Sequence, residues 1–166
     1  MNSTIDRRGL LGGAGLALAG IAVMRWPAPA ASAAQGKYAV MRTPAEWKRL
    51  LGPQRFAILR QAGTERAFSS PLDKEKRRGL FVCAGCALPL FASAAKFDSG
   101  TGWPSFWKAL PRAVATKIDR GAMLMERTEV LCARCGGHLG HLFDDGPRPT
   151  GLRYCMNGLA LRFRPG

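Results

Sequence analysis

Two pairs of cysteines place the strongest constraint on how this chain folds. Cys83 and Cys86 form one CxxC pair, Cys132 and Cys135 form a second, and residues 87–131 separate the two. A CxxC turn presents two sulfur atoms from one tight loop, so two such turns can supply the four thiolates of a tetrahedral zinc site. We therefore expect a structural zinc ion that joins distant segments and leaves no open coordination position for chemistry.

Three other interpretations use the same four cysteines. Each pair could close a local disulfide in an oxidising compartment. Each pair could be a redox CxxC motif, although neither shows the strand-to-helix context of that motif. Iron could replace zinc, because a four-cysteine site accepts both metals. The presence of two pairs, with Gly85 and Gly136 available for the turns, favours structural zinc.

The first 33 residues are typical of an export signal. Arg7 and Arg8 precede an uncharged run over residues 9–24, which is shorter than the about 20 residues that a membrane span needs. Small residues at positions 31–33 then suit a signal peptidase. The adjacent arginines resemble a twin-arginine signal, with an ordinary secretory signal or an uncleaved anchor as the alternatives. The expected organisation is an export signal over 1–33 that leads to the periplasm, a tether over 34–42 and one domain over 43–166.

The net charge of +14 belongs mostly to the expected mature domain. Residues 1–33 hold three basic side chains and one acidic side chain, which leaves 22 basic against 10 acidic, or +12. A basic surface favours anionic partners without choosing among them. Two CxxC knuckles on a basic domain could belong to a zinc-ribbon module that binds nucleic acid. The export signal argues against this, and few aromatic side chains lie among basic residues as stacking platforms.

Local patterns predict two short helices followed by a compact, mostly antiparallel β domain. Thr43, Pro44 and Glu46 form a helix start, the pair at 52–53 ends that helix, and a second helix covers 54–61. The expected inward side chains are Trp47, Leu50 and Leu51 in the first helix and Phe56, Ile58 and Leu59 in the second.

Short apolar runs separated by Gly, Pro and Asp then indicate β-strands. One hairpin is expected to turn near residues 119–121. The expected strands cover 79–83, 89–91, 113–118, 122–132, 141–143, 152–158 and 159–163.

The fifth cysteine, Cys155, stands outside both pairs in the segment GLRYCMNG. A buried, inert cysteine is common and is the simplest interpretation. On a strand, however, Arg153 and Asn157 point to the same face as Cys155. An arginine beside a thiol favours the thiolate and lowers the pKa of the thiol. Cys155 is therefore a candidate nucleophile.

Both histidines of the chain, His138 and His141, lie in the segment HLGHLFDD, which also contains Asp145. Histidine moves protons near neutral pH, so this segment is a candidate acid–base partner for Cys155. The two histidines could instead bind a metal, but no further ligand set accompanies them.

The segment GTGWPSFW contributes three large aromatic side chains. Trp103 lies in a loop between Gly102 and Pro104, where its ring could line a pocket. Phe106 and Trp107 are expected to belong to an aromatic core.

Taken together, these segments resemble the B-type methionine-R-sulfoxide reductases from about Thr43 to Phe163. The motifs that carry the resemblance are GTERAF, CAGC, CARC, KFDSGTGWPSF, HLGHLFDDGP and GLRYCMNG, in the order found in that family. The resemblance implies a mainly β fold, a small domain of two antiparallel sheets with peripheral helices. It also implies reduction of the R epimer of methionine sulfoxide in proteins. The chain could instead be a relative that keeps the fold but has no activity. The presence of the site residues argues against that interpretation.

The resemblance places Cys155 on the catalytic cysteine of the family. In the implied reaction the Cys155 thiolate attacks the sulfoxide sulfur and becomes a sulfenic acid. His141, helped by His138 or Asp145, organises the proton that the oxygen needs. Arg153 holds the thiolate, Asn157 orients the site, and Trp103 packs against the substrate methyl group. The implied zinc ligands are Cys83, Cys86, Cys132 and Cys135.

The chain departs from the family pattern at Thr101. Many members of the family carry a resolving cysteine at this position, just before GWPSF. We therefore expect the Cys155 sulfenic acid to be reduced directly by an external thiol, such as a thioredoxin-like protein. The mature protein is expected to be a monomer.

Overall fold

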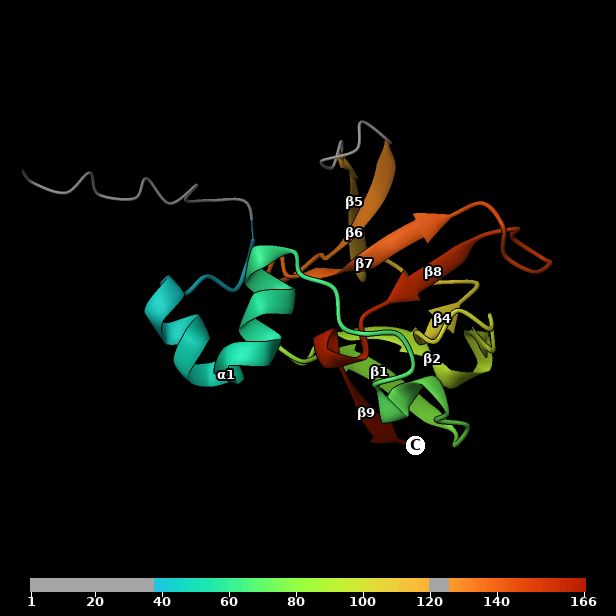
Figure 1. Cartoon of the computed structure of the whole chain (residues 1–166), viewed down its shortest axis with the longest axis horizontal. Coiled ribbons are helices and arrows are strands. Elements are labelled where there is room, and N and C mark those ends of the chain that lie inside the picture. The colour runs from blue at the N-terminus through green and yellow to red at the C-terminus, as the bar shows by residue number, and fades with distance from the viewer. Residues whose placement is uncertain (1–37, 120–125) are drawn as a thin grey trace, which may run out of the picture. The chain divides into compact units, whose positions relative to one another are not determined.

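The computed structural model describes residues 38–119 and 126–166. Within these two ranges, helix α1 (Pro44–Gln61) precedes two antiparallel sheets (Figure 1). The three-stranded sheet has the order β2-β1-β9, and the six-stranded sheet has the order β3-β4-β8-β7-β6-β5. The predicted fold class, a small mainly β domain of two antiparallel sheets, is confirmed. In the described ranges no helix has the length and apolar character needed to cross a membrane.

The strands of the three-stranded sheet are β1 (Gly79–Cys83), β2 (Pro89–Ala92) and β9 (Leu161–Pro165). Those of the six-stranded sheet are β3 (Lys96–Phe97), β4 (Ser105–Phe106), β5 (Val114–Asp119), β6 (Arg127–Cys132), β7 (His138–Phe143) and β8 (Arg153–Met156). Three short 3₁₀ turns complete the described elements: η1 (Pro71–Asp73), η2 (Ser93–Ala95) and η3 (Gly158–Ala160).

The predicted strands differ from the observed ones mainly at their ends. The last strand starts at Leu161, because the residues before it form η3. The predicted hairpin is confirmed by the pairing of Asp119 with Arg127, while Arg120 and Gly121 of its predicted turn lie outside the described residues. Strands β3 and β4 were not predicted, since two residues each show no periodicity.

Helix α1 begins with the predicted capping box, in which Thr43 and Glu46 each bind the other's backbone N–H. Gly52 interrupts the helix with a non-helical backbone (φ 70°, ψ 171°), so the two predicted helices are the two halves of one kinked element. The predicted inward position of Leu50 is wrong, because 48% of its surface is exposed. Only Trp47 and Leu51, four residues apart, form the narrow buried stripe of the first half.

Aromatic side chains fill the core between the sheets. Phe106 stacks on Phe91 with ring centroids 4.3 Å apart and meets Phe81 edge-on at 4.9 Å. The core assignment of Phe106 is thereby confirmed, while Trp107 is only half-buried. The second half of α1 contributes Ile58 and Leu59 to the same apolar cluster, so helix and sheets share one core.

Residues 38–42, the described part of the expected tether, lie against the turn that contains the second cysteine pair. The backbone N–H of Val40 donates to the carbonyl of Arg134 at 3.0 Å. The ring of Tyr38 lies so close to Gly136 that a side chain there has no room. The expected export signal over 1–33 lies outside the described residues.

Candidate active site and metal centre

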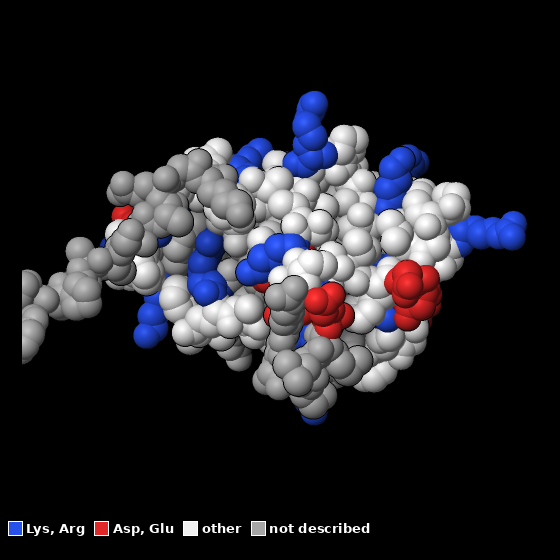
Figure 2. Space-filling model, turned by 90° about the horizontal axis from the view of Figure 1, so that it is seen from above, with Lys and Arg blue, Asp and Glu red and all other residues white. Residues whose placement is uncertain are grey.

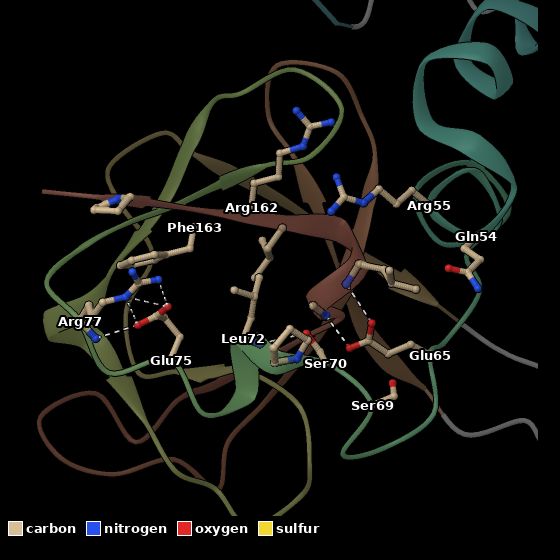
Figure 3. Close-up of a pocket in the computed structure, with 15 residues that line it drawn as sticks. Gln54, Arg55, Glu65, Ser69, Ser70, Leu72, Glu75, Arg77, Arg162 and Phe163 are labelled. Atoms are coloured by element: carbon tan, nitrogen blue, oxygen red, sulfur yellow. Dashed lines mark hydrogen bonds and ion pairs between the residues drawn. The ribbon is translucent and has the colours of Figure 1, made fainter.

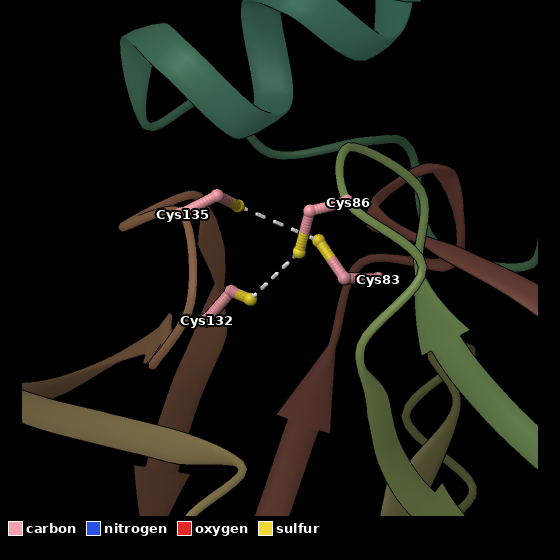
Figure 4. Close-up of side chains that lie close together, drawn as sticks. All are labelled: Cys83, Cys86, Cys132 and Cys135. Atoms are coloured by element: carbon pink, nitrogen blue, oxygen red, sulfur yellow. Dashed lines mark hydrogen bonds between the residues drawn. The ribbon is translucent and has the colours of Figure 1, made fainter. Parts of the chain in front are cut away.

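The four paired cysteines converge where the two sheets meet at one end (Figure 4). Cys83 ends β1 and Cys86 follows in the turn to β2, whereas Cys132 ends β6 and Cys135 lies in the turn to β7. The closest sulfur pairs run between the two turns, at 3.7 Å for Cys83 with Cys135 and 3.5 Å for Cys86 with Cys132. All four sulfur atoms lie within 4.8 Å of one another.

These distances fit a tetrahedral metal site. Zn–S bonds of about 2.3 Å require sulfur–sulfur edges of about 3.8 Å. A disulfide needs about 2.05 Å between sulfur atoms, and all four side chains are free thiols. The alternative of two local disulfides is therefore wrong for this structure. The cluster would bind a metal ion that connects the two sheets.

The two cysteine turns share one backbone design. Ala87 and Gly136, each four residues after the first cysteine of its pair, adopt left-handed φ values of 58° and 65°. Each donates its N–H to the carbonyl of that cysteine, Cys83 or Cys132, at 2.8 Å. Gly136 has the predicted turn role, but Ala87 rather than Gly85 takes the equivalent position in the first turn.

Helix α1 covers the cysteine cluster. Both terminal nitrogens of Arg60 donate to the carbonyl of Cys135 at 3.0 Å. The guanidinium of Arg60 lies 3.9 Å above the ring of Trp47, which is itself buried in the core. The helix, like the two sheets, is thus fixed to the metal centre.

Cys155 lies on β8, in the middle of the six-stranded sheet. Its direct cross-strand neighbours are Ser105 on β4 and His141 on β7. The same row continues through Glu129 on β6 to Lys117 on β5. Because directly paired residues point to the same face of a sheet, this row places a thiol, an imidazole and an ion pair side by side.

A small cavity of about 180 Å³ opens in front of Cys155. Four of the predicted site residues line it, namely Cys155, His141, Trp103 and Asn157. His138, Asp145 and Arg153 do not line it. Its remaining wall comes from Thr64, Arg127, Gly140 and Phe143.

Trp103 and Asn157 are held by one buried residue, Glu65. The indole N–H of Trp103 donates to the Glu65 carbonyl at 3.1 Å, and the Asn157 side-chain oxygen accepts from the Glu65 N–H at 2.9 Å. The Glu65 carboxylate accepts from the N–H groups of Gly158 and Leu159 at 2.6 and 2.8 Å. Sequence reasoning missed Glu65, although its place in the GTERAF motif was a usable signal.

Of the two predicted helpers of His141, only His138 contacts it, and its carboxylate partner is one that the sequence did not predict. Its Nε2 lies 3.2 Å from the Oδ2 atom of Asp119, which also accepts a hydrogen bond from Arg127 at 3.0 Å. The predicted helper carboxylate, Asp145, is elsewhere. Asp119 could not be found from spacing, because it lies on β5 and meets His141 only through the registers of the sheet.

His138 lies behind the cavity. Its side chain is 3% exposed, its Nδ1 lies 2.7 Å from Oε1 of Glu129, and its ring meets that of His141 edge-on at 5.4 Å. Burial lowers the pKa of His138, and the Glu129 carboxylate opposes this shift only in part. A neutral His138 therefore supports His141 by contact.

Asp145 binds Arg153 in a two-pronged ion pair with distances of 2.7 and 2.8 Å. The Arg153 guanidinium also lies 4.3 Å from the centre of the Phe143 ring. Asp145 thus fixes the arginine beside Cys155 instead of assisting His141. The ion pair does not line the cavity, but Arg153 packs against Phe143, which does.

The part of the chain that matches known proteins includes both the metal centre and the Cys155 cavity. A family model described as the SelR domain matches residues 51–165. The chain belongs to the SelR domain family.

Similar curated proteins agree with this assignment. The chain is 50% identical to the peptide methionine sulfoxide reductase MsrB of Leptospira interrogans over 76% of this chain and 97% of the relative. It is 53% identical to the protein of the same name from Thiobacillus denitrificans, over 75% and 94%. It is also 53% identical to the chloroplastic peptide methionine sulfoxide reductase B1 of Arabidopsis thaliana, over 70% of this chain and 58% of that longer protein.

The thiol of this SelR domain is harder to ionise than the sequence suggested. Burial raises the pKa of Cys155, and Thr101, Arg153 and Ser105 each oppose this without outweighing it. Thr101 lies close, with its Oγ1 atom 3.9 Å from the Cys155 Sγ. The predicted contribution of Arg153 has the right direction, but burial outweighs it, so the net shift of the Cys155 pKa is upward.

We predict that alkylation of Cys155 by iodoacetamide in the substrate-free protein follows an apparent pKa above that of an ordinary thiol. Arg153→Gln will raise this pKa further, because it removes the cation that stabilises the thiolate. The measurement is the alkylation rate of the Cys155 peptide by mass spectrometry across neutral and alkaline pH.

Arg164→Gln on β9 is the matched control, since it removes the same charge from an exposed position outside the cavity. A wild-type profile below the ordinary thiol pKa, or one that Arg153→Gln leaves unchanged, would contradict this account of Cys155.

Proposed function

We propose that this protein reduces the R epimer of methionine sulfoxide in oxidised proteins to methionine, with Cys155 as the nucleophile. The observation that carries the proposal is the cavity in which Cys155, His141 and Trp103 face one another. Membership of the SelR family and the names of its relatives support the same reaction.

The chemistry balances around a single thiol. The Cys155 thiolate attacks the sulfoxide sulfur, and a proton delivered to the oxygen makes the S–O bond easier to break. The attack forms a bond between the Cys155 Sγ and the substrate sulfur. That bond and the S–O bond then break as the hydroxyl group passes to Sγ, so methionine leaves with two more electrons on its sulfur and Cys155, oxidised by two electrons, becomes a sulfenic acid. His141, fixed by Asp119, is the group placed to handle that proton.

Epimer selection follows from the chirality of the sulfoxide sulfur. A site that places the methyl group against the Trp103 ring and the oxygen toward His141 leaves one direction of attack for Cys155. Glu65 and Asn157 hold the Trp103 ring in place and so maintain this selection.

We predict that the protein without residues 1–33 reduces the R epimer of a blocked methionine sulfoxide with dithiothreitol as reductant, and does not reduce the S epimer. Cys155→Ser will lower kcat by at least about 1,000-fold, because it removes the nucleophile. The measurement is methionine formation from each separated epimer. Thr150→Ser, on an exposed loop, is the control for handling of the variants. Turnover of S, or equal turnover by Cys155→Ser, would refute the proposal.

We propose that the sulfenic acid is reduced directly by an external dithiol, such as a thioredoxin-like protein. Its first thiol forms a mixed disulfide with Cys155 and releases water, and its second thiol restores Cys155 and leaves the reductant as a disulfide. The residue beside the Cys155 sulfur at the family's resolving position is Thr101, which cannot form a disulfide. The other four cysteines are gathered in the metal centre. The same arrangement suits a protein that works as a monomer.

No observation favours the nucleic-acid-binding interpretation. On the face shown in Figure 2 the Lys and Arg side chains stand apart from one another, whereas a nucleic-acid binder gathers them in a stripe or patch. We propose that the positive charge helps an acidic reductant to dock.

We propose that the metal is zinc, held by Cys83, Cys86, Cys132 and Cys135, and that residues 1–33 form a twin-arginine export signal to the periplasm. Four thiolates suit zinc, and its role there is structural. The twin-arginine route carries folded proteins, so zinc would bind in the cytoplasm and protect the thiols before export.

We predict that protein recovered from the exported fraction contains one zinc ion per chain and no disulfide. Structural zinc contributes an apparent free energy of about 10 kcal/mol or more to folding, so Cys132→Ser should lose the metal and fail to reach this fraction. The measurements are elemental analysis and thiol counting. Disulfides in place of zinc, or iron instead of zinc, would refute the proposal.

A further inference from the structure

A second, larger cavity lies behind the segment that carries Glu65 (Figure 3). Its volume is about 820 Å³, within the range of sites that accept sizeable ligands. Helix α1 supplies Arg55, β9 supplies Arg162 and Phe163, and the segment around η1 supplies Leu72. Of the residues that line it, the proposed reaction uses only Glu65, which holds Trp103 from the other side.

Two uncompensated positive charges stand at one edge of the cavity. Neither Arg55 nor Arg162 makes a hydrogen bond or an ion pair within residues 38–119 and 126–166, and Figure 3 shows both guanidinium groups at the same side. Burial lowers the pKa of Arg55, and repulsion from Arg162 adds to that effect. Two cations this close, without a partner, favour an anionic ligand between them.

The other charged groups of the cavity are already satisfied. Arg77 pairs with Glu75 at 2.6 Å, and the Glu65 carboxylate is bound by backbone N–H groups. The positive charge is therefore concentrated at Arg55 and Arg162.

The rest of the cavity wall combines apolar side chains with Gln54, Ser69 and Ser70. Leu72, Leu161 and Phe163 contribute to it beside the two arginines. Such a surface suits a peptide segment with a carboxylate for the arginines and an apolar side chain for the floor. A free inorganic anion would leave most of the cavity unused.

Neighbouring residues of the chain line the larger cavity and the Cys155 cavity, so a thin wall separates the two. Thr64 lines the Cys155 cavity and the next residue, Glu65, lines the larger one. Gly158, also in this wall, comes three residues after Cys155. A substrate chain that occupies both cavities therefore has to pass over this wall, and an extended chain advances about 3.3 Å per residue.

We propose that this cavity is a second binding site for the substrate protein, and that it takes an acidic, partly apolar segment near the methionine sulfoxide. The inference rests on the proposed function. The carboxylate binds Arg55 and Arg162 by charge-assisted hydrogen bonds, while a neighbouring apolar side chain covers Leu72 and Phe163. The enzyme therefore prefers oxidised methionines that are flanked by acidic residues.

The test compares peptides that each contain one R-methionine sulfoxide and differ only in their flanks. One series carries Asp or Glu beside Leu at successive distances from the sulfoxide, and the other carries Lys at the same positions. Dithiothreitol is the reductant, so no protein reductant contributes. The variant is Arg55→Gln combined with Arg162→Gln, and Arg164→Gln is the control on the same strand.

We predict that the double variant raises KM for the best acidic peptide about tenfold and leaves kcat unchanged, as the loss of a charge-assisted contact implies. Turnover of blocked methionine sulfoxide and of the Lys peptides will not fall. Added salt will raise KM for the acidic peptide in the wild type and much less in the double variant.

Three outcomes would overturn the proposal. The first is an equal KM for acidic and Lys peptides in the wild type, and the second is an equal effect of Arg164→Gln. The third is phosphate binding to Arg55 and Arg162 that does not compete with the acidic peptide. Failure of the wild type to turn over blocked methionine sulfoxide would instead refute the proposed reaction itself.

Discussion

Contact among four cysteine sulfurs is the constraint on which the rest of the structure depends. The sulfurs come from one turn in each sheet, and the clustered atoms bring together segments that are far apart in the sequence. Strand β7 starts three residues after Cys135 and carries His138 and His141 toward Cys155. Metal binding at one end of the sheets therefore fixes the start of the strand that positions the histidines, and Arg60 fixes α1 to the same point.

Cys155 is largely buried, and its polar neighbours oppose the effect of this burial on the pKa of the thiol. Burial raises the pKa of the thiol, which protects it from incidental oxidation, while Arg153, Thr101 and Ser105 keep the thiolate accessible. A substrate that fills the cavity brings its sulfur atom directly to this thiol. The reactivity of the Cys155 thiol then depends on whether substrate occupies the cavity. This protects Cys155, which matters because no other cysteine lies close enough to form a disulfide with it if it is oxidised by accident.

Sequence reasoning succeeded where the signal was local. The CxxC pairs, the capping box at Thr43 and the shared face of Arg153 and Cys155 follow from spacings of a few residues. It failed where the register of the strands decides which side chains meet. The carboxylate partner of His141 is Asp119, which lies on a distant strand. Asp145, the carboxylate that was expected there, binds Arg153. The net pKa shift of Cys155 was missed for the same reason, because burial depends on the whole fold.

We expect that Cys155 alone accepts the oxygen of the substrate and that no other cysteine of the chain forms a disulfide with it. The most direct measurement is mass spectrometry after one turnover with an R-methionine sulfoxide peptide, without reductant and with a probe that traps sulfenic acid. We predict one trapped sulfenic acid on Cys155 for each methionine formed, with the four metal-centre cysteines unmodified. A disulfide between Cys155 and any of those four cysteines, or methionine formed without oxidation of Cys155, would contradict this expectation.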